Sequence, residues 1–252
     1  MKKLSEIVII DKWKELRRDM NLFRAVEPSV ELIAITQPLQ RLKELGVTSE
    51  TLPAYTARHC WESSGQYTED PEHNHELDLR LTRNLIKRGH DTPLQALEFT
   101  FDVLNTSKSV QAQWTRHKIG VGWSYRSTRF VEASGNNFVY NAYDYINDEK
   151  KVKELLRIDE DVNMNAVNMY EEKRNLGATK QDSRKVMPVQ FATNCSFFSN
   201  ARALRHLYNL RIDKHAEWEI RRMSAMLLDE VMQFTPAIFE DIHEKFLDKY
   251  SK

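Results

Sequence analysis

The feature that most constrains how this chain can fold is the order of its hydrophobic patterns. Strand-like segments lie in the first half of the sequence, whereas helical periodicity dominates from residue 148 onward. A parallel α/β fold would instead alternate strands and helices along its whole length. The order therefore predicts an α+β fold, with a mixed or antiparallel sheet and long helices.

Three segments have the composition or the alternation of β-strands. In the segment 98–103, Phe99, Phe101 and Val103 recur at every second position and should share the buried face of a sheet. The segment 30–35 is rich in β-formers and ends before a proline, as a first strand would. We expect a third strand at 127–132.

Helical signals are clearest where capping residues flank an apolar stripe. Asp70-Pro71 is a typical helix start, leucines recur at every fourth position from 77 to 85, and Gly89 follows the last turn. The other expected helices span 39–45, 107–116, 162–174, 200–210 and 214–234, and Pro236 begins a last one.

The domain organisation follows from what the chain lacks. Residues 29–252 contain no repeat, low-complexity tract or long block of like charge. Only 7 of the 252 residues are glycine, below the usual share of about 7%, so flexible linkers are scarce. We therefore expect a single domain at 29–252, preceded by a helical or irregular extension at 1–28.

Charge and cysteine content narrow the class of protein. Lys plus Arg and Asp plus Glu both total 37, whereas a dedicated nucleic-acid binder usually carries excess positive charge. Two cysteines, Cys60 and Cys195, are too few to cross-link a fold of this length and indicate free thiols in a reducing compartment. The apolar run 7–10 is too short for a secretory signal or a membrane span. We expect a cytoplasmic protein that does not enter membranes.

Two groups of polar residues could carry chemistry. On a helix, Gln113, Arg116 and His117 share one face, and on a strand, Ser127 and Arg129 share one side. Together they would supply donors for a phosphate and for the edge of a pyrimidine. The alternative is a solvated basic surface with ordinary salt bridges.

A second group lies near residue 211. In a continuous helix Arg211, His215 and Trp218 would form one stripe, at i, i+4 and i+7. Asp213 could instead cap a new helix and turn the chain there. The alternative to a functional role is ordinary packing.

Two other interpretations deserve comparison. Aromatic residues interleaved with basic ones could form a single-stranded nucleic-acid-binding module; they are Trp114, Trp123, Tyr125 and Phe130. A metal site could be sought among His59, Cys60, His73 and His75. Zinc, however, needs three or four ligands at a recognisable spacing, so we expect no metal.

Five segments, in this order, resemble the flavin-dependent thymidylate synthases. They are 30–36, Gly89-His90-Asp91-Thr92-Pro93-Leu94, Gln113-Trp114-Thr115-Arg116-His117-Lys118, Ser127-Thr128-Arg129-Phe130, and the block from Leu210 to Ile220. The resemblance extends from about residue 30 to residue 246. Because the long motifs are separate and in family order, we identify the chain as a divergent member of this family.

The resemblance implies a homotetramer with active sites between subunits, which makes deoxythymidylate from deoxyuridylate. Methylenetetrahydrofolate would donate the carbon, FAD the hydride, and NADPH the electrons. The implied nucleotide-binding residues are Gln113, Arg116, Ser127, Arg129, Arg184 and Arg211. The implied flavin-binding residues are His117, Lys118, His206 and His215. Arg211 and Ser127 would be catalytic; a permanently charged guanidinium beside the uracil would stabilise developing enolate charge.

Four positions depart from the family pattern. Lys118 stands where the family has arginine. Its ammonium is a single point of charge, whereas a guanidinium can donate two parallel hydrogen bonds. Ala96 replaces a usual histidine, Tyr125 a glutamate and Phe130 a tyrosine. These departures keep open a relative that acts on deoxycytidylate or that makes a hydroxymethyl product.

Overall fold

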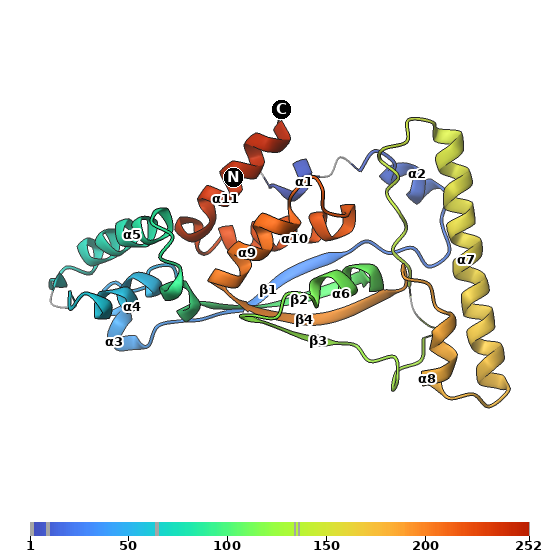
Figure 1. The fold of residues 1–252 in the computed structure, drawn as a ribbon, viewed down its shortest axis with the longest axis horizontal. Helices are drawn as coiled ribbons and strands as arrows, with labels where there is room; N and C mark the ends of the chain where they lie inside the picture. The colour runs from blue at the N-terminus through green and yellow to red at the C-terminus, as the bar shows by residue number, and fades with distance from the viewer. Residues whose placement is uncertain (1–2, 9–10, 64–65, 134, 136, 252) are drawn as a thin grey trace.

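The computed structural model describes residues 3–8, 11–63, 66–133, 135 and 137–251, so residues 9–10 of the first apolar run lie outside it. The chain forms an elongated body with the sheet at its middle (Figure 1). A helical lobe built from α3 (Gln40–Lys43), α4 (Leu52–Cys60) and α5 (Pro71–Lys87) lies at one end. The long helix α7 (Glu149–Asn175) lies at the other end, beside α8 (Lys180–Ser183).

Four strands form one sheet within the described residues, and all pair antiparallel in the order β1-β2-β4-β3. This confirms the predicted α+β class. The strands are β1 (Ser29–Ile35), β2 (Glu98–Ser107), β3 (Val121–Tyr125) and β4 (Ala192–Asn200). The sequence patterns predict β1 and β2 but not β3 or β4.

The prediction of a strand at residues 127–132 was wrong. The backbone N–H groups of Phe130 and Val131 both donate to the carbonyl oxygen of Ser127, at 3.2 and 3.1 Å, which closes a turn just after β3. Ser127 and Arg129 therefore do not alternate along a strand. Their relative position is set by this turn instead.

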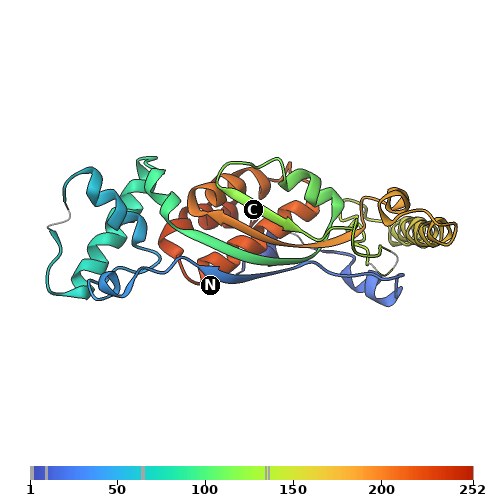
Figure 2. The same ribbon diagram turned by 90° about the horizontal axis from the view of Figure 1, so that it is seen from below.

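The larger of two hydrophobic clusters lies on one face of the sheet, and the smaller one includes Val152, Leu156 and Tyr170 of α7. Phe99, Phe101 and Val103 are buried on that face, as the alternation in β2 predicts, and Phe197 of β4 stacks on Phe101 at 5.7 Å between ring centroids. Helices α9 (Ala201–Arg211), α10 (Trp218–Met232) and α11 (Pro236–Ser251) cover it, and the strands pass in front of them in Figure 2. The opposite face exposes Ile33, Leu104 and Phe198.

The predicted helices mostly exist, with shifted ends. In α5 the Asp70 carboxylate accepts hydrogen bonds from the N–H groups of Glu72 and His73, which confirms the expected cap. Helix α7 begins at Glu149 rather than near residue 162. Helix α9 ends at Arg211 and α10 begins at Trp218. Arg211, His215 and Trp218 therefore do not lie on one continuous helix, and the stripe that such a helix would form does not exist.

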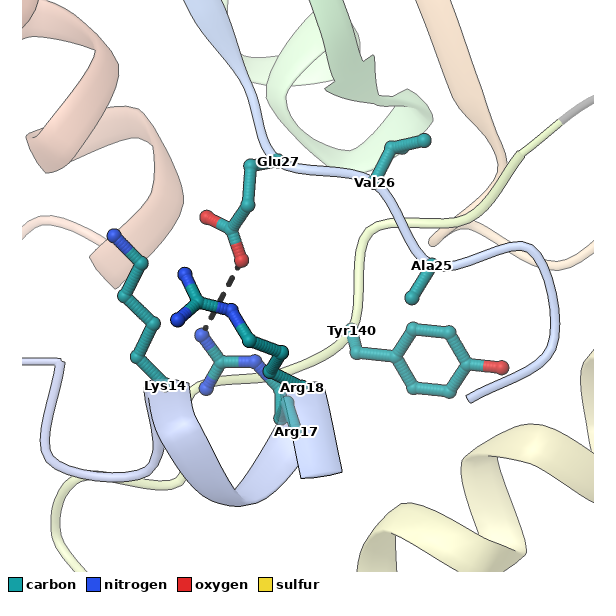
Figure 3. Close-up of a pocket in the computed structure, with 7 residues that line it drawn as sticks. All are labelled: Lys14, Arg17, Arg18, Ala25, Val26, Glu27 and Tyr140. Carbon is teal, nitrogen blue, oxygen red and sulfur yellow. Dashed lines mark ion pairs between the residues drawn. The ribbon is translucent and has the colours of Figure 1, made fainter. Parts of the chain in front are cut away.

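The N-terminal segment packs against the rest of the chain. The carboxylate of Asp229 in α10 accepts hydrogen bonds from the backbone N–H groups of Leu4 (2.7 Å) and Ser5 (2.9 Å), at the start of α1 (Ser5–Val8). Figure 3 shows α2 (Lys14–Asp19), from which the buried Arg17 pairs with Glu27 at 3.6 Å. The segment is thus anchored at both of its short helices.

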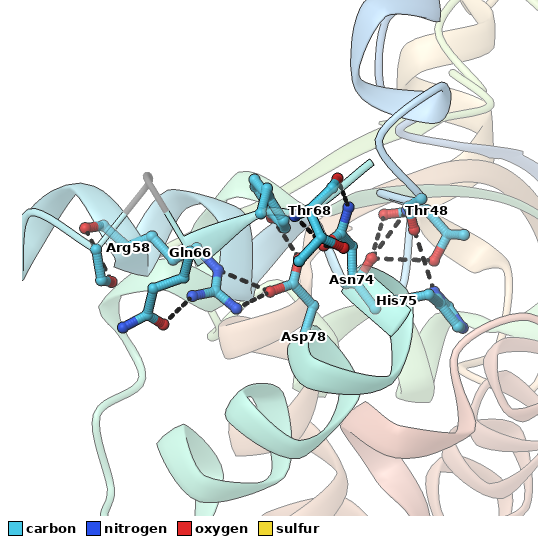
Figure 4. A network of polar contacts seen from close by, with 11 residues as sticks. Thr48, Arg58, Gln66, Thr68, Asn74, His75 and Asp78 are labelled. Atoms are coloured by element: carbon cyan, nitrogen blue, oxygen red, sulfur yellow. Dashed lines mark hydrogen bonds and ion pairs between the residues drawn. The ribbon is translucent and has the colours of Figure 1, made fainter. Parts of the chain in front are cut away.

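The α4–α5 lobe is held by a buried ion pair. Arg58 of α4 donates to one carboxylate oxygen of Asp78 in α5 through Nε (2.8 Å) and Nη2 (2.6 Å), and Tyr67 donates to the other oxygen (Figure 4). Both ionic side chains are buried. The 3₁₀ turn η2 (Thr92–Ala96) connects this lobe to β2.

Cys60 and Cys195 are free thiols, as expected. Among the helices of the described ranges, none combines the length and the apolar character that crossing a bilayer needs. In the same ranges no three His, Cys, Asp or Glu side chains gather where they could hold a metal ion.

Candidate active site

The first part of the site lies where the end of α6 (Lys108–Trp114) meets the end of α9. Arg211 donates through Nε to Nε2 of His117 at 3.0 Å and through Nη2 to the backbone carbonyl of Gln113 at 3.2 Å. Three residues that the sequence analysis singled out, from two distant segments, are thus brought into contact.

Local structure holds this contact in place. Ser107 caps α6 by accepting from the N–H of Val110, and Trp114 anchors the other end of the helix in the core. Gly120 adopts φ +71°, a conformation that favours glycine, and its carbonyl accepts from the N–H of Asn200 at 3.0 Å. Because Asn200 also caps α9, the loop carrying His117 is fixed to the first turn of that helix.

A pocket of about 380 Å³ opens beside this contact. Its lining includes the cationic side chains of Arg116, Lys118 and Arg211. The imidazoles of His117 and His206 meet edge to face there, with ring centroids 6.1 Å apart. No carboxylate lines the pocket, so its electrostatics favour an anionic ligand.

His117 is a neutral imidazole in this setting. Burial, the Arg211 guanidinium and His206 lower its pKa from 6.5 to about 4. Because Nε2 accepts a hydrogen bond from Arg211, the single ring proton lies on Nδ1. His117 therefore presents a hydrogen-bond donor at neutral pH without adding charge. Burial and the nearby Arg116 lower the pKa of Arg211 itself, but a guanidinium stays charged.

The second part of the site lies beyond β3. Arg184, in the 3₁₀ turn η3 (Arg184–Val186), donates to the hydroxyl of Thr128 at 2.9 Å. Arg129 donates through Nε to the side chain of Gln181 at 2.9 Å, and the hydroxyl of Ser127 accepts from the N–H of Arg129 at 3.4 Å. Ser127, Arg129 and Arg184 thus share one corner of the chain, near α8.

The two parts are separate within one chain. The strand β3 runs from the α9 side of the sheet toward α8 (Figure 1), since Val121 pairs with Ser199 and Tyr125 with Cys195. A strand of five residues spans about 13 Å. The chain therefore presents two cationic surfaces, one with Gln113, Arg116, His117, Lys118, His206 and Arg211, the other with Ser127, Arg129 and Arg184.

His215 stands apart from both surfaces. Its side chain is 96% exposed and its Nδ1 lies 2.7 Å from the carboxylate of Asp213. Asp213 does turn the chain, by accepting from the N–H of His215, but the cap of α10 is Glu217. His215 is therefore not part of the lining of the first pocket.

The aromatic residues considered for nucleic-acid stacking face the core. Trp114 is fully buried and lies 5.2 Å from Trp123, which stacks on Phe197 at 4.0 Å. Tyr125 packs beside Trp123, whereas Phe130 is 75% exposed. One exposed ring among these four residues is no platform for successive bases, so they do not support the nucleic-acid interpretation.

Lys108, which was not predicted as a site residue, lines a second cavity together with Arg184. This cavity has a volume of about 260 Å³ and its polar lining includes Lys108, Thr128, Arg184 and Lys185. The available signal was a lysine placed directly after the Ser107 helix cap.

These features define a class of protein with an antiparallel α+β fold and two cationic surfaces, whose charge favours anionic ligands. The chain belongs to the family described as thymidylate synthase complementing protein, whose model matches residues 43–237. The matched range contains every site residue discussed above. It confirms the family resemblance seen in the sequence motifs.

Individual relatives agree with this assignment. A flavin-dependent thymidylate synthase of Thermosipho africanus is 29% identical over 176 residues, covering 66% of this chain and 76% of the relative. One of Pyrococcus furiosus is 27% identical over 185 residues, covering 73% and 72%. One of Geobacter sulfurreducens is 28% identical over 193 residues, covering 76% and 81%.

Proposed function

We propose that the protein synthesises deoxythymidylate from deoxyuridylate, with methylenetetrahydrofolate as carbon donor, FAD as hydride donor and NADPH as the source of electrons. The observation that carries the proposal is the contact of Arg211 with His117 and Gln113 at the edge of a cationic pocket. The shared name of the relatives supports the same reaction.

The first pocket fits a flavin nucleotide. Lys118 offers positive charge to a pyrophosphate, and the imidazoles of His117 and His206 offer donors and ring surface to a heterocycle. We assign His117, Lys118 and His206 to flavin binding, with His215 contributed by another copy. When bound, FAD would supply the hydride that completes the methyl group.

The nucleotide would bind with its base beside Arg211. C5 of uracil must become electron-rich before it can attack the carbon unit, and the enolate charge that makes it so lies partly on a carbonyl oxygen of the base, where a guanidinium stabilises it without giving up a proton. Gln113 and Arg116 lie on the same side and would orient the ring. Ser127, Arg129 and Arg184 would bind the phosphate and hold the nucleotide in place.

The strand β3, which is about 13 Å long, separates these two surfaces. We therefore propose that each active site combines surfaces from different copies in a homotetramer. The uncovered sheet face exposes Ile33, Leu104 and Phe198, and α7 exposes Ile158 and Met169. Exposed apolar surface of this kind favours association of copies. Light scattering should give a mass of four chains; a monomer at working concentration would contradict the assembly.

Co-expression of two inactive variants tests the shared site. Arg211→Ala and Arg184→Ala each remove one surface, so each homo-oligomer should be inactive. A mixed oligomer contains some sites built from two intact surfaces and should recover activity. If the mixture stays as inactive as the separate variants, each site lies within one chain.

Mass spectrometry of the product tests the reaction itself. Deoxyuridylate incubated with methylenetetrahydrofolate, FAD and NADPH should gain a methyl group, and the purified protein should bleach when NADPH is added without air. A hydroxymethyl product, or reaction with deoxycytidylate instead, would support the alternative that Lys118 and Ala96 favour. No product from either nucleotide would overturn the proposed function.

A further inference from the structure

The second cavity, which lies beside the first turn of α6, is lined by more positive charge than the neighbouring residues neutralise. Lys108 follows the Ser107 cap and is half-buried, and it lines the cavity with Arg184 and the buried Thr128. No carboxylate contributes to the lining. Lys185, also at this cavity, is paired with Asp182 at 3.3 Å.

Lys108 lies close to two further cations. Burial lowers its pKa, and so do Arg184 from η3 and Arg126 from the segment after β3, whereas the Cys195 thiol of β4 acts in the opposite direction. Like charges crowd together in this way only at a cost in free energy, since each disfavours the charged form of the others. Lys108 is thus held in a strongly electropositive environment.

None of these three cations forms an ion pair within the described ranges. The ammonium of Lys108 donates to the neutral side-chain oxygen of Gln111 at 2.7 Å. Arg184 donates to the Thr128 hydroxyl at 2.9 Å, and Arg126 to the backbone carbonyl of Glu132 at 3.3 Å. Each cation keeps donors free, so together they suit a doubly charged anion with several acceptor oxygens, as in a phosphate monoester.

We propose that Lys108 is a further phosphate-binding residue, which with Arg184 holds the phosphate of the nucleotide in this cavity, while Arg126 adds positive charge from outside the lining. Neither Lys108 nor Arg126 is among the residues that the family motifs identify. The identity of the nucleotide rests on the proposed function, whereas the anion site rests on the cluster of cations alone.

Isothermal titration of the full-length protein with deoxyuridylate and with deoxyuridine isolates the contribution of the phosphate. The variants are Lys108→Met, which keeps the length of the side chain but not its charge, and Lys108→Arg, which keeps the charge. Lys153→Met is the matched control, since it removes a lysine whose partner Glu149 lies on the exposed surface of α7. Circular dichroism verifies that each variant is folded.

Lys108→Met should weaken deoxyuridylate binding about tenfold, the loss expected for one charge-assisted hydrogen bond. Lys108→Arg should restore most of the affinity, and deoxyuridine should bind all variants equally. Unchanged deoxyuridylate binding in Lys108→Met, or an equal loss for deoxyuridine, overturns the proposal. If Lys108→Met does not fold, Lys108→Gln replaces it under the same criteria.

Inorganic phosphate separates this inference from the proposed function. Phosphate, compared with chloride at equal ionic strength, should raise the melting temperature of the wild type and of Lys153→Met but not of Lys108→Met. If this holds while deoxyuridylate is not bound, the anion site stands and the nucleotide assignment fails. If phosphate has no effect on the wild type, there is no phosphate site at Lys108.

Discussion

Arg211 donates through Nε to Nε2 of His117 at 3.0 Å, although the two residues are 94 positions apart in the sequence. The contact joins the C-terminus of α9 to the loop after α6. It fixes both the direction of the guanidinium and the tautomer of the imidazole. The electrostatics of the first pocket therefore depend on this one pair.

Replacing Arg211 by alanine should change both the titration of His117 and the reaction rate. Removing the neighbouring positive charge should raise the His117 pKa from about 4 toward 6.5, which NMR of the ring protons can follow. Turnover should fall about 10²- to 10³-fold, the usual loss for one transition-state donor. Arg202→Ala, on an exposed position of the same helix, is the control. An unchanged His117 pKa would show that Arg211 is not its main neighbour in solution.

The buried carboxyl of Glu219 should make stability depend on pH. Glu219 accepts from the backbone N–H of Ser107 at 2.8 Å, and burial raises its pKa from 4.5 to about 7. Because the folded protein holds this proton to higher pH than the unfolded chain, the stability that Glu219 contributes is present below pH 4.5 and is lost as the pH rises to 7. The effect is at most about 3 kcal/mol.

Glu219→Gln should remove this dependence, because glutamine keeps an acceptor for Ser107 and does not ionise. Urea unfolding at pH 5.5 and 7.5 measures it. Wild type should be more stable at pH 5.5 by a margin that Glu219→Gln lacks, while Glu154→Gln, on an exposed position of α7, should behave as wild type. Equal pH dependence in wild type and Glu219→Gln would refute the titration of this group.

The fold was predictable where one pattern dominated. In β2 the buried side chains alternate from Glu98 to Leu104, so this part of the strand and its inner face were both predicted. In β4 Cys195 and Phe197 point inward, but the half-exposed Phe198 points outward, so apolar and polar residues do not alternate in the sequence. Most of the other positions in β4 are Ser, Thr or Asn, which are weak signals for a strand. In β3 the five residues are too few to show a period, and Gly122 lowers strand propensity.

The site was predictable only as groups of residues. The predicted helix through Gln113, Arg116 and His117 ends at Trp114, so Arg116 and His117 lie in the turn that follows it. The contacts of Gln113 and His117 with Arg211 join segments whose pairing no local pattern encodes. The family motifs supplied that link. Lys108 belongs to no motif, and its environment arises from η3 and the segment after β3, so it emerged only from the three-dimensional arrangement.

Removing one partner of the Arg58–Asp78 pair should destabilise the α4–α5 lobe strongly. Asp78→Ala leaves the Arg58 guanidinium buried without its carboxylate, which typically costs about 3–5 kcal/mol. Glu240→Ala, which breaks the solvent-accessible pair with Arg83, should cost less than about 1 kcal/mol. Urea unfolding compares the two. Similar losses for both variants would mean that the Arg58–Asp78 pair is hydrated in solution.

Gly120→Ala should disturb the first pocket as well as stability. A Cβ at this position would lie 2.5 Å from the side-chain nitrogen of Asn200, the residue that caps α9. Alanine also disfavours the φ of +71°, at a cost of about 1–2 kcal/mol. The matched control is Gly177→Ala, since Gly177 has φ +90° but nothing within 4 Å of a Cβ.

Both glycine variants should therefore lose the backbone contribution, whereas only Gly120→Ala should displace Asn200 and the loop that carries His117. We expect Gly120→Ala to shift the His117 pKa and to weaken nucleotide binding, and Gly177→Ala to change neither. Thermal unfolding measures the shared loss, and NMR titration of His117 measures the local one. If the two variants have the same unfolding temperature and the same His117 pKa, the approach of Gly120 to Asn200 does not position the loop. The position of His117 beside Arg211 would then depend on α6 rather than on this approach.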